Sequence, residues 1–407
     1  MSTNNQNADA FVNDAVQKND DQFMTELSQR NQMDEEDLTP VSAPRGPFSC
    51  ITRCVHKVMP PGGIVASAFS LAGGTIGAGI LGLPAGTNAC GVITSMILLT
   101  YVTVLTIFSL RMLSIVASKS GIKSFEGLTR WLFPQGHYAF SYFSAFIRWF
   151  FSFGCCIGYV ISVMDLFKPI FDESLKRSET ENKALVYFAS ANGRRLIAFL
   201  VWLVFMVPLV IPRHIDTLRF ASFLAIMFMV YFCIIIIVHS CLNGLKIHKN
   251  NVVISGPKTA NDGAQIFLFR SGNSAVSDLG TFCFSYICQV NAVEVFWDMR
   301  PEVRTVNGFT KAGALGIMIC TIIYIMVSIF GYFDFGAEKL ATNSMLLMYN
   351  PLDEPEVMVA YIGVLIKLIV AYALLHIGCR NSVYYCIGWT EKYKVVEKPQ
   401  GGGDQPR

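Results

Sequence analysis

Long apolar stretches alternate with short polar ones along most of the chain, and this pattern predicts membrane-spanning helices. A helix that crosses a bilayer needs roughly 20 predominantly apolar residues. Eight stretches approach that length, near Ile64–Thr87, Val92–Ser114, Tyr138–Leu166, Leu196–Ile211, Phe220–Leu242, Leu279–Trp297, Ala312–Phe333 and Val357–Cys379. The sequence therefore predicts an all-α integral membrane protein with about eight transmembrane helices.

Polar segments flank and connect these spans. Residues 1–58, rich in Asn, Gln, Asp and Glu, are predicted to form a disordered cytoplasmic tail, residues 59–390 a transmembrane domain, and residues 391–407 a polar C-terminal tail. Charged and aromatic residues interleave between Lys119 and His137, which is typical of an amphipathic helix at the membrane surface. Lysine and arginine modestly favour the side of the N-terminus, which predicts a cytoplasmic N-terminus, although Arg194-Arg195 argues against it.

Composition excludes several classes of function. The chain is 53% hydrophobic and 15% charged, against roughly 25% charged residues in soluble domains. A net charge of +3 is too small to indicate nucleic-acid binding. The apolar composition instead predicts that membrane lipid surrounds the protein. Most of the 12 cysteines lie within apolar segments without zinc spacing, so we expect no metal and no cofactor. Dinucleotide, phosphate-loop and hydrolase motifs are missing, so no enzyme is predicted.

The first span contains the motif Gly-Gly-Thr-Ile-Gly-Ala-Gly-Ile-Leu-Gly-Leu-Pro at residues 73–84. Glycine and proline are the poorest helix formers, so this density predicts a helix interrupted in mid-membrane. The backbone freed by the break makes a cluster of candidate substrate-binding residues: Thr75, Ile76, Gly77, Ala78 and Gly79. The alternative is that the glycines only allow close helix packing.

The sixth span carries polar residues in an apolar setting, namely Ser285, Gln289, Asn291 and Glu294. Polar groups at membrane depth normally face a partner or a cavity. Gln289 and Asn291 are two residues apart, so a regular helix would not point both the same way, whereas an unwound segment would. Ser285, Gln289 and Asn291 are therefore candidate substrate-binding residues. The alternative is hydrogen bonding between helices without a ligand.

Ionisable residues inside the spans are the remaining candidates. Lys367 is central in the eighth span, where an ammonium must find a partner, reach water or lose its proton. Three roles are expected for it: it replaces a sodium ion, it titrates during transport, or it forms a fixed ion pair with Glu294 or Asp165. Glu294 and Lys367 are the candidates for coupling transport to an ion. Arg148 is expected near the cytoplasmic interface. His239 and His376 lie near span ends and are expected to be structural.

The first-span motif closely resembles that of the amino acid/auxin permease family, and within it the kinetoplastid amino acid transporter branch. The segments Phe284–Met299, Met345–Pro351 and Cys379–Asn381 are also similar to that family, and the resemblance covers about residues 60–390. It implies a leucine-transporter-like helical bundle built from two inverted repeats, usually with about eleven spans.

The resemblance further implies an amino acid substrate, held by the unwound parts of spans one and six. Carried onto this chain, these parts are Thr75–Gly79 and Ser285–Asn291. The coupling ion in the family is sodium or a proton, and sodium ligands come partly from spans one and eight. Lys367 is at odds with a sodium site there, so it favours proton coupling or uncoupled transport.

The printed chain departs from the family because only the polar residues 391–407 follow the eighth span. This predicts a C-terminally truncated copy or a reduced architecture. We expect an amino acid permease, a symporter in the family pattern, that works by alternating access. The alternative is a non-transporting homologue that acts as a sensor, a partner subunit or an inactive gene product. The plasma membrane is the expected location, with an internal organelle membrane as the alternative.

Overall fold

The computed structural model describes residues 60, 62–133, 139–178, 183–211, 219–248, 250–257, 263, 265–271, 273–342 and 345–387. The predicted tails, residues 1–58 and 391–407, lie outside the described residues.

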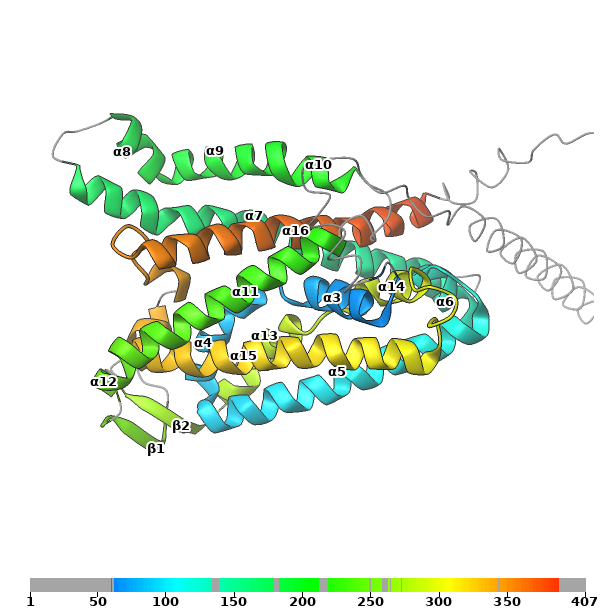
Figure 1. Ribbon diagram of the computed structural model, residues 1–407, viewed down its shortest axis with the longest axis horizontal. Coiled ribbons are helices and arrows are strands. Elements are labelled where there is room, and N and C mark those ends of the chain that lie inside the picture. Colours follow the sequence, from blue (N-terminus) through cyan, green and yellow to red (C-terminus); the bar gives the residue numbers. More distant parts are fainter. Residues whose placement is uncertain are drawn as a thin grey trace, which may run out of the picture.

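Long apolar helices form the body of the molecule (Figure 1). They are α5 (Val92–Ser120), α7 (Ala139–Arg177), α9 (Ala191–Val201), α11 (Arg219–His239), α15 (Val306–Thr342) and α16 (Pro355–Cys386). α9 continues through η1 (Trp202–Met206) into α10 (Val207–Val210), and α11 continues through η3 (Ser240–Gly244) into α12 (Leu245–His248). Each of these two runs makes one span.

Two further spans are broken. The first consists of α3 (Ile64–Thr75) and α4 (Gly79–Cys90), which are bent by 63° at the break. The sixth consists of α13 (Ser274–Ser285), the 3-10 turn η4 (Gln289–Asn291) and α14 (Ala292–Trp297).

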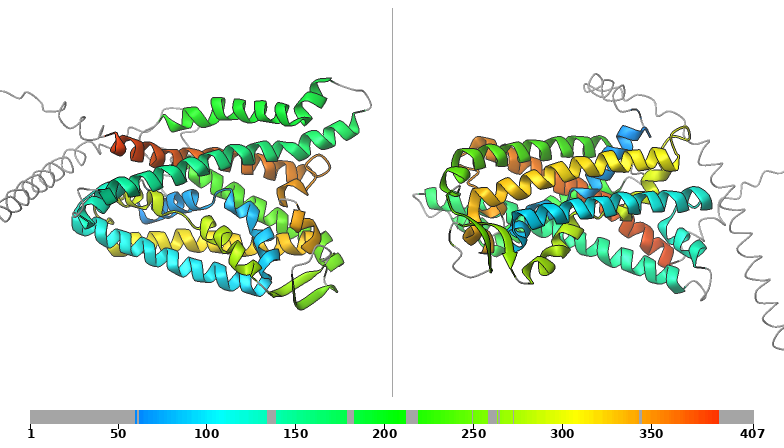
Figure 2. Two further views of the ribbon diagram at one scale, coloured as in Figure 1. Left: turned by 180° about the vertical axis from the view of Figure 1, so that it is seen from behind. Right: turned by 90° about the horizontal axis from the view of Figure 1, so that it is seen from below.

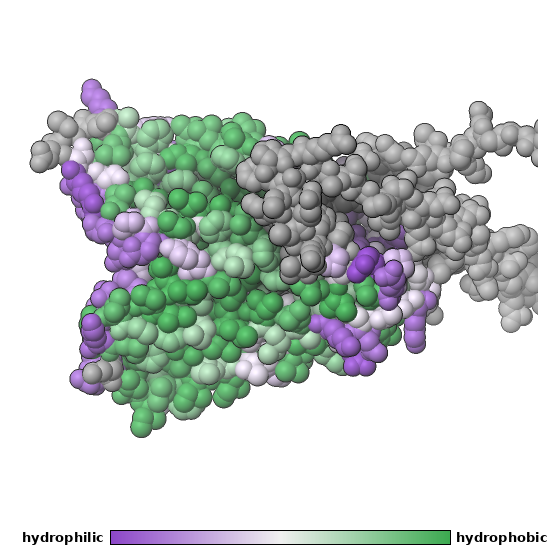
Figure 3. Space-filling model, in the orientation of Figure 1, coloured by the Kyte–Doolittle hydropathy of each residue, from purple (hydrophilic) through white to green (hydrophobic). Residues whose placement is uncertain are grey.

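The predicted number of spans is confirmed. Among the described residues, seven helices are long and apolar enough to cross a membrane, and the bent α3–α4 pair supplies an eighth. Apolar side chains cover the middle of the surface in Figure 3, and hydrophilic ones gather towards its two ends. The chain is an all-α, multi-pass integral membrane protein.

The two broken spans pack against each other in opposite directions. α3 contacts α14, whereas α4 contacts α13, so the first half of span one lies beside the second half of span six. In Figures 1 and 2 these four helices lie between α5 and α15 on one side and α7 and α16 on the other. This arrangement places both breaks in the interior of the bundle.

The two ends of the bundle carry short elements. We call the end with α6 (Phe125–Leu132), which links α5 to α7, the near end, and the opposite end the far end. α6 is the helix predicted between Lys119 and His137, and the Ser124 hydroxyl caps it by accepting from the Gly127 N–H. At the far end, between α12 and α13, β1 (Val252–Pro257) and β2 (Ile266–Ser271) form a parallel pair.

Candidate functional site

The break in span one begins where α3 ends, at Thr75. Ile76 adopts extended backbone (φ −68°, ψ 106°), and its N–H donates to the Ala72 carbonyl at 2.9 Å. The Thr75 hydroxyl donates to the Leu71 carbonyl at 2.7 Å, so its hydrogen is already used within the helix. Thr75 and Ile76 are buried, whereas Gly77 and Ala78 are half-buried before α4 starts at Gly79. The predicted unwinding is therefore present, over residues 76–78.

The break in span six lies directly against the break in span one. α13 ends at Ser285, and regular helix resumes only at Ala292. A Cβ atom on Gly79 would lie 2.7 Å from the Ser285 Oγ and 3.1 Å from its Cα. Only glycine at position 79 lets the two segments approach this closely.

Tyr324 of α15 connects the two breaks. Its hydroxyl lies 3.1 Å from the Thr75 carbonyl oxygen and 2.7 Å from the Ser285 carbonyl oxygen, so its single hydrogen is shared between the last residues of α3 and α13. Tyr324 was not among the residues predicted for the site. A tyrosine inside an apolar span is the signal that was available, because a buried hydroxyl normally finds a hydrogen-bond partner.

Helix ends of opposite polarity meet at the paired breaks. The C-terminal ends of α3 and α13 present carbonyl groups, and the N-terminal end of α4 at Gly79 presents N–H groups without intrahelical acceptors. The helix dipole makes the carbonyl ends attractive to cations and the N–H end attractive to anions. A molecule with adjacent ammonium and carboxylate groups matches this arrangement of charges.

Lys367 of α16 points to the same break. Its side chain is 1% exposed, and its ammonium donates to the Gly73 carbonyl in the last turn of α3. The predicted alternative, an ion pair with Glu294 or Asp165, is not what the structure contains: Glu294 pairs with another cation, and Asp165 lies near Lys168 and Arg194. The sequence could not reveal this acceptor, because a backbone carbonyl freed by a helix break belongs to no particular residue type.

Arg148 of α7 binds two carboxylates at once. One guanidinium nitrogen is 2.9 Å from the Glu126 Oε1, and the other donates to Glu294 and, at 2.5 Å, to the Val290 carbonyl. The Ser382 hydroxyl of α16 also donates to Glu126 at 2.7 Å. We call Glu126, Arg148, Glu294 and Ser382 the near-end ionic cluster. It joins α6, α7, α14 and α16.

This cluster corrects two expectations. Arg148 is 4% exposed and does not extend to the membrane surface, because both of its partners lie inside the bundle. Glu126, predicted among the polar residues of a surface helix, is 1% exposed and faces Arg148. Arg148 holds two carboxylates with a single positive charge, and the Glu294 Oε2 has no hydrogen-bond partner.

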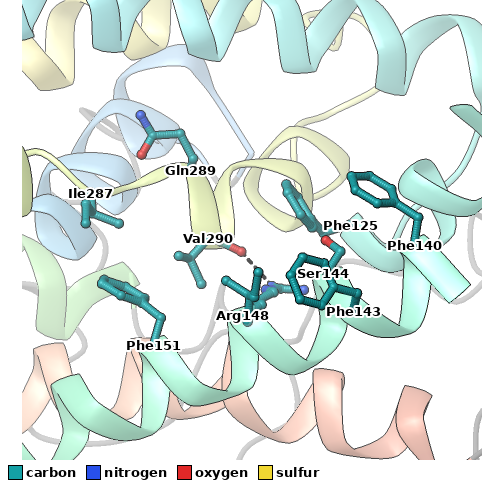
Figure 4. A pocket seen from close by; sticks show the side chains of 10 residues that line it. Phe125, Phe140, Phe143, Ser144, Arg148, Phe151, Ile287, Gln289 and Val290 are labelled. Carbon is teal, nitrogen blue, oxygen red and sulfur yellow. Dashed lines mark hydrogen bonds between the residues drawn. The ribbon is translucent and has the colours of Figure 1, made fainter. Parts of the chain in front are cut away.

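A cavity of about 330 Å³ reaches the sixth-span break from the side of α7 (Figure 4). Phenylalanine and isoleucine side chains make most of its wall, and Ser144, Arg148 and Gln289 are its polar lining residues. Gln289 lines this cavity, but the Asn291 amide donates to the Leu374 carbonyl of α16 at 3.1 Å. The unwound segment therefore does not direct Gln289 and Asn291 to one point, contrary to the prediction.

Comparisons with known proteins identify the family. A model described as transmembrane amino acid transporter protein matches residues 60–395. The Schizosaccharomyces pombe protein named vacuolar amino acid transporter 5 is 25% identical over 336 residues, which are 80% of this chain and 70% of that protein. The Xenopus laevis protein named sodium-coupled neutral amino acid transporter 7 is 25% identical over 311 residues, 76% of this chain and 63% of its own length.

The match thus spans less than two thirds of the frog relative. The Saccharomyces cerevisiae protein named vacuolar amino acid transporter 5 is 24% identical over 337 residues, 82% of this chain and 69% of that protein. No solved structure matches the chain significantly. These relatives are transporters and not enzymes. The family resemblance expected from the first-span motif is confirmed, because the match covers all of the described bundle. The chain belongs to the transmembrane amino acid transporter family, the amino acid/auxin permeases.

Proposed function

We propose that this chain moves amino acids across its membrane by alternating access and binds them at the paired breaks of spans one and six. The observation that carries the proposal is the meeting of two helix C-terminal ends, α3 and α13, with the N-terminal end of α4. The substrate ammonium group would lie near the Thr75 and Ser285 carbonyls. Its carboxylate would lie near the N–H groups of Gly77–Gly79.

The near-end ionic cluster supports the alternating-access part of the proposal. It ties α6, α7, α14 and α16 together between the breaks and the near end. Access from the near end requires α14 to move away from α7, and the Arg148–Glu294 pair opposes that movement. We propose that this pair is intact when the near side is closed and is broken when it opens.

The test of substrate recognition is equilibrium binding of labelled amino acids to the purified chain. Because recognition rests on the ammonium and carboxylate groups of the substrate, N-acetylated amino acids and amino acid amides are expected not to compete. Neutral amino acids are expected to compete better than charged ones, because the wall beside Gln289 is mainly apolar and the charge of Arg148 is already matched. Competition by analogues that lack either backbone charge would contradict this site.

Lys367 supports proton-coupled or uncoupled transport. The frog relative is named sodium-coupled, but in this chain an ammonium already contacts the Gly73 carbonyl. Uptake by the wild type is therefore expected to persist when sodium is replaced by a large organic cation. Lys367→Met is expected to lower uptake about tenfold or more, since a charged hydrogen bond contributes roughly 1.5–3 kcal/mol.

The control for this prediction is Lys176→Met, because Lys176 is exposed and pairs only locally with Glu173. It is expected to leave uptake unchanged. A wild type that requires sodium, or a Lys367→Met variant with full uptake, would contradict the role given to Lys367.

The plasma membrane remains the predicted location, and tagging the chain in its own cell checks it against an internal membrane.

A further inference from the structure

His239, at the end of α11, lies between two carboxylates at the far end of the bundle. Its Nδ1 is 2.7 Å from the Asp334 Oδ2 of α15, and its Nε2 is 3.6 Å from the Oε1 of Glu354, the residue before α16. The Tyr349 hydroxyl donates to the same Asp334 oxygen at 2.8 Å. We call His239, Asp334, Tyr349 and Glu354 the far-end cluster.

Two contacts beside the cluster fix this arrangement. A Cβ atom on Gly244 would lie 2.4 Å from the Asp334 Cα, so the run that continues α11 is in direct contact with α15. Tyr361 of α16 donates to the Leu346 carbonyl, which attaches the segment before Glu354 to α16. Asp334 is fixed in the interior, with a side chain that is 1% exposed.

Water still reaches part of the cluster. The side chains of His239 and Glu354 are 21% and 35% exposed, so a proton can enter and leave from the far side. The groups that face His239 are Asp334 from α15, Tyr349 after η5 (Met345–Leu347), and Glu354 before α16, with Tyr361 behind Tyr349. These are two carboxylates and two phenols.

The geometry favours the imidazolium form of His239. A neutral imidazole has one N–H, so one of its nitrogens would turn a lone pair towards a carboxylate oxygen. An imidazolium carries a hydrogen on both nitrogens and can face both carboxylates favourably. Its single positive charge also offsets the two negative charges.

We propose that the far-end cluster is a proton-binding site that fastens residues 345–354 to α11 and α15. Protonated His239 joins Asp334 to Glu354, so residues 345–354 are held when the far side is acidic. As the pH rises and the proton leaves, the link to Glu354 is lost and the segment loosens. If the proposed transport function holds, this loosening would control access to the paired breaks from the far side.

The experiment is hydrogen–deuterium exchange of the purified full chain between pH 5 and pH 8, corrected for the intrinsic pH dependence of exchange. Peptides that cover residues 345–354 are expected to lose protection as the pH rises, by up to about tenfold per pH unit, which is the limit for one linked proton. His239→Gln is expected to remove this pH step, and Glu354→Gln, which keeps Asp334 paired, to reduce it.

One variant serves as the matched control. His376→Gln changes another histidine of a span, one that stacks on Tyr372, and is expected to keep the step. A step of unchanged size in His239→Gln, or no step in the wild type, would overturn the proposal.

Exchange does not depend on transport, so the two proposals fail separately. Uptake without a pH step in residues 345–354 would remove the proton site and leave the transport function intact. A pH step in a chain that binds and moves no amino acid would do the reverse.

Discussion

Gly77→Leu is expected to abolish amino acid uptake while the protein still reaches its membrane. A Cβ atom at position 77 would lie 2.5 Å from the Tyr159 hydroxyl oxygen and 3.3 Å from two of its ring carbons. Tyr159 is 4% exposed, so the packing around it opposes its displacement by a new side chain. A side chain at position 77 must therefore occupy the space at the break. Initial uptake rates, divided by the amount of tagged protein at the membrane, measure the effect.

Gly74 provides the matched control for this prediction. A Cβ atom on Gly74 would meet nothing within 4 Å, although the residue lies only three positions away in the same glycine motif. Gly74→Ala is therefore expected to retain uptake, whereas Gly77→Ala loses most of it. Adding Tyr159→Phe to Gly77→Ala removes the closest atom and should restore part of the activity. Full uptake by Gly77→Leu would exclude the proposed substrate site.

Arg148→Met is expected to lower the stability of the fold more than any other single change proposed here. It leaves Glu126 and Glu294 buried without a counter-charge, and removing one partner from a buried ion pair costs roughly 3–5 kcal/mol. The melting temperature of the purified protein should fall clearly. Changing both carboxylates to glutamine in the Arg148→Met background is expected to recover most of the loss, because no unpaired charge then remains.

An exposed ion pair gives the comparison. Arg177 pairs with Asp353 at the surface, where water screens the charges. Arg177→Met is therefore expected to leave the melting temperature nearly unchanged. Equal losses from Arg148→Met and Arg177→Met would mean that the near-end ionic cluster does not stabilise the bundle as described.

The sequence predicted the spans well because their signal is local. An apolar stretch of sufficient length must become a helix in a bilayer, whatever its neighbours are. The break in span one was also predictable, since the glycines that cause it are adjacent in the chain at residues 73–82. The turn at Gln289–Asn291 was also expected, but on the premise that these two side chains face one point, and in the structure they do not.

The partners within the site could not be predicted, because they come from helices distant in the sequence. Arg148 meets Glu294, which is 146 residues further along the chain, and Tyr324 meets Thr75 across 249 residues. An ion pair with Glu294 or Asp165 was one of three roles expected of Lys367, but its ammonium donates instead to the Gly73 carbonyl in the last turn of α3. Residue types alone do not reveal which backbone groups a helix break leaves free.

Uptake of labelled neutral amino acids tests the central claim most directly. The full chain would be produced in cells that lack their own permeases, with its delivery to the membrane followed by an epitope tag. We predict saturable uptake by the wild type and by Gly74→Ala, and none by Gly77→Leu at equal delivery. Absence of uptake by the delivered wild type, or equal uptake by Gly77→Leu, would contradict amino acid transport through the paired breaks of spans one and six.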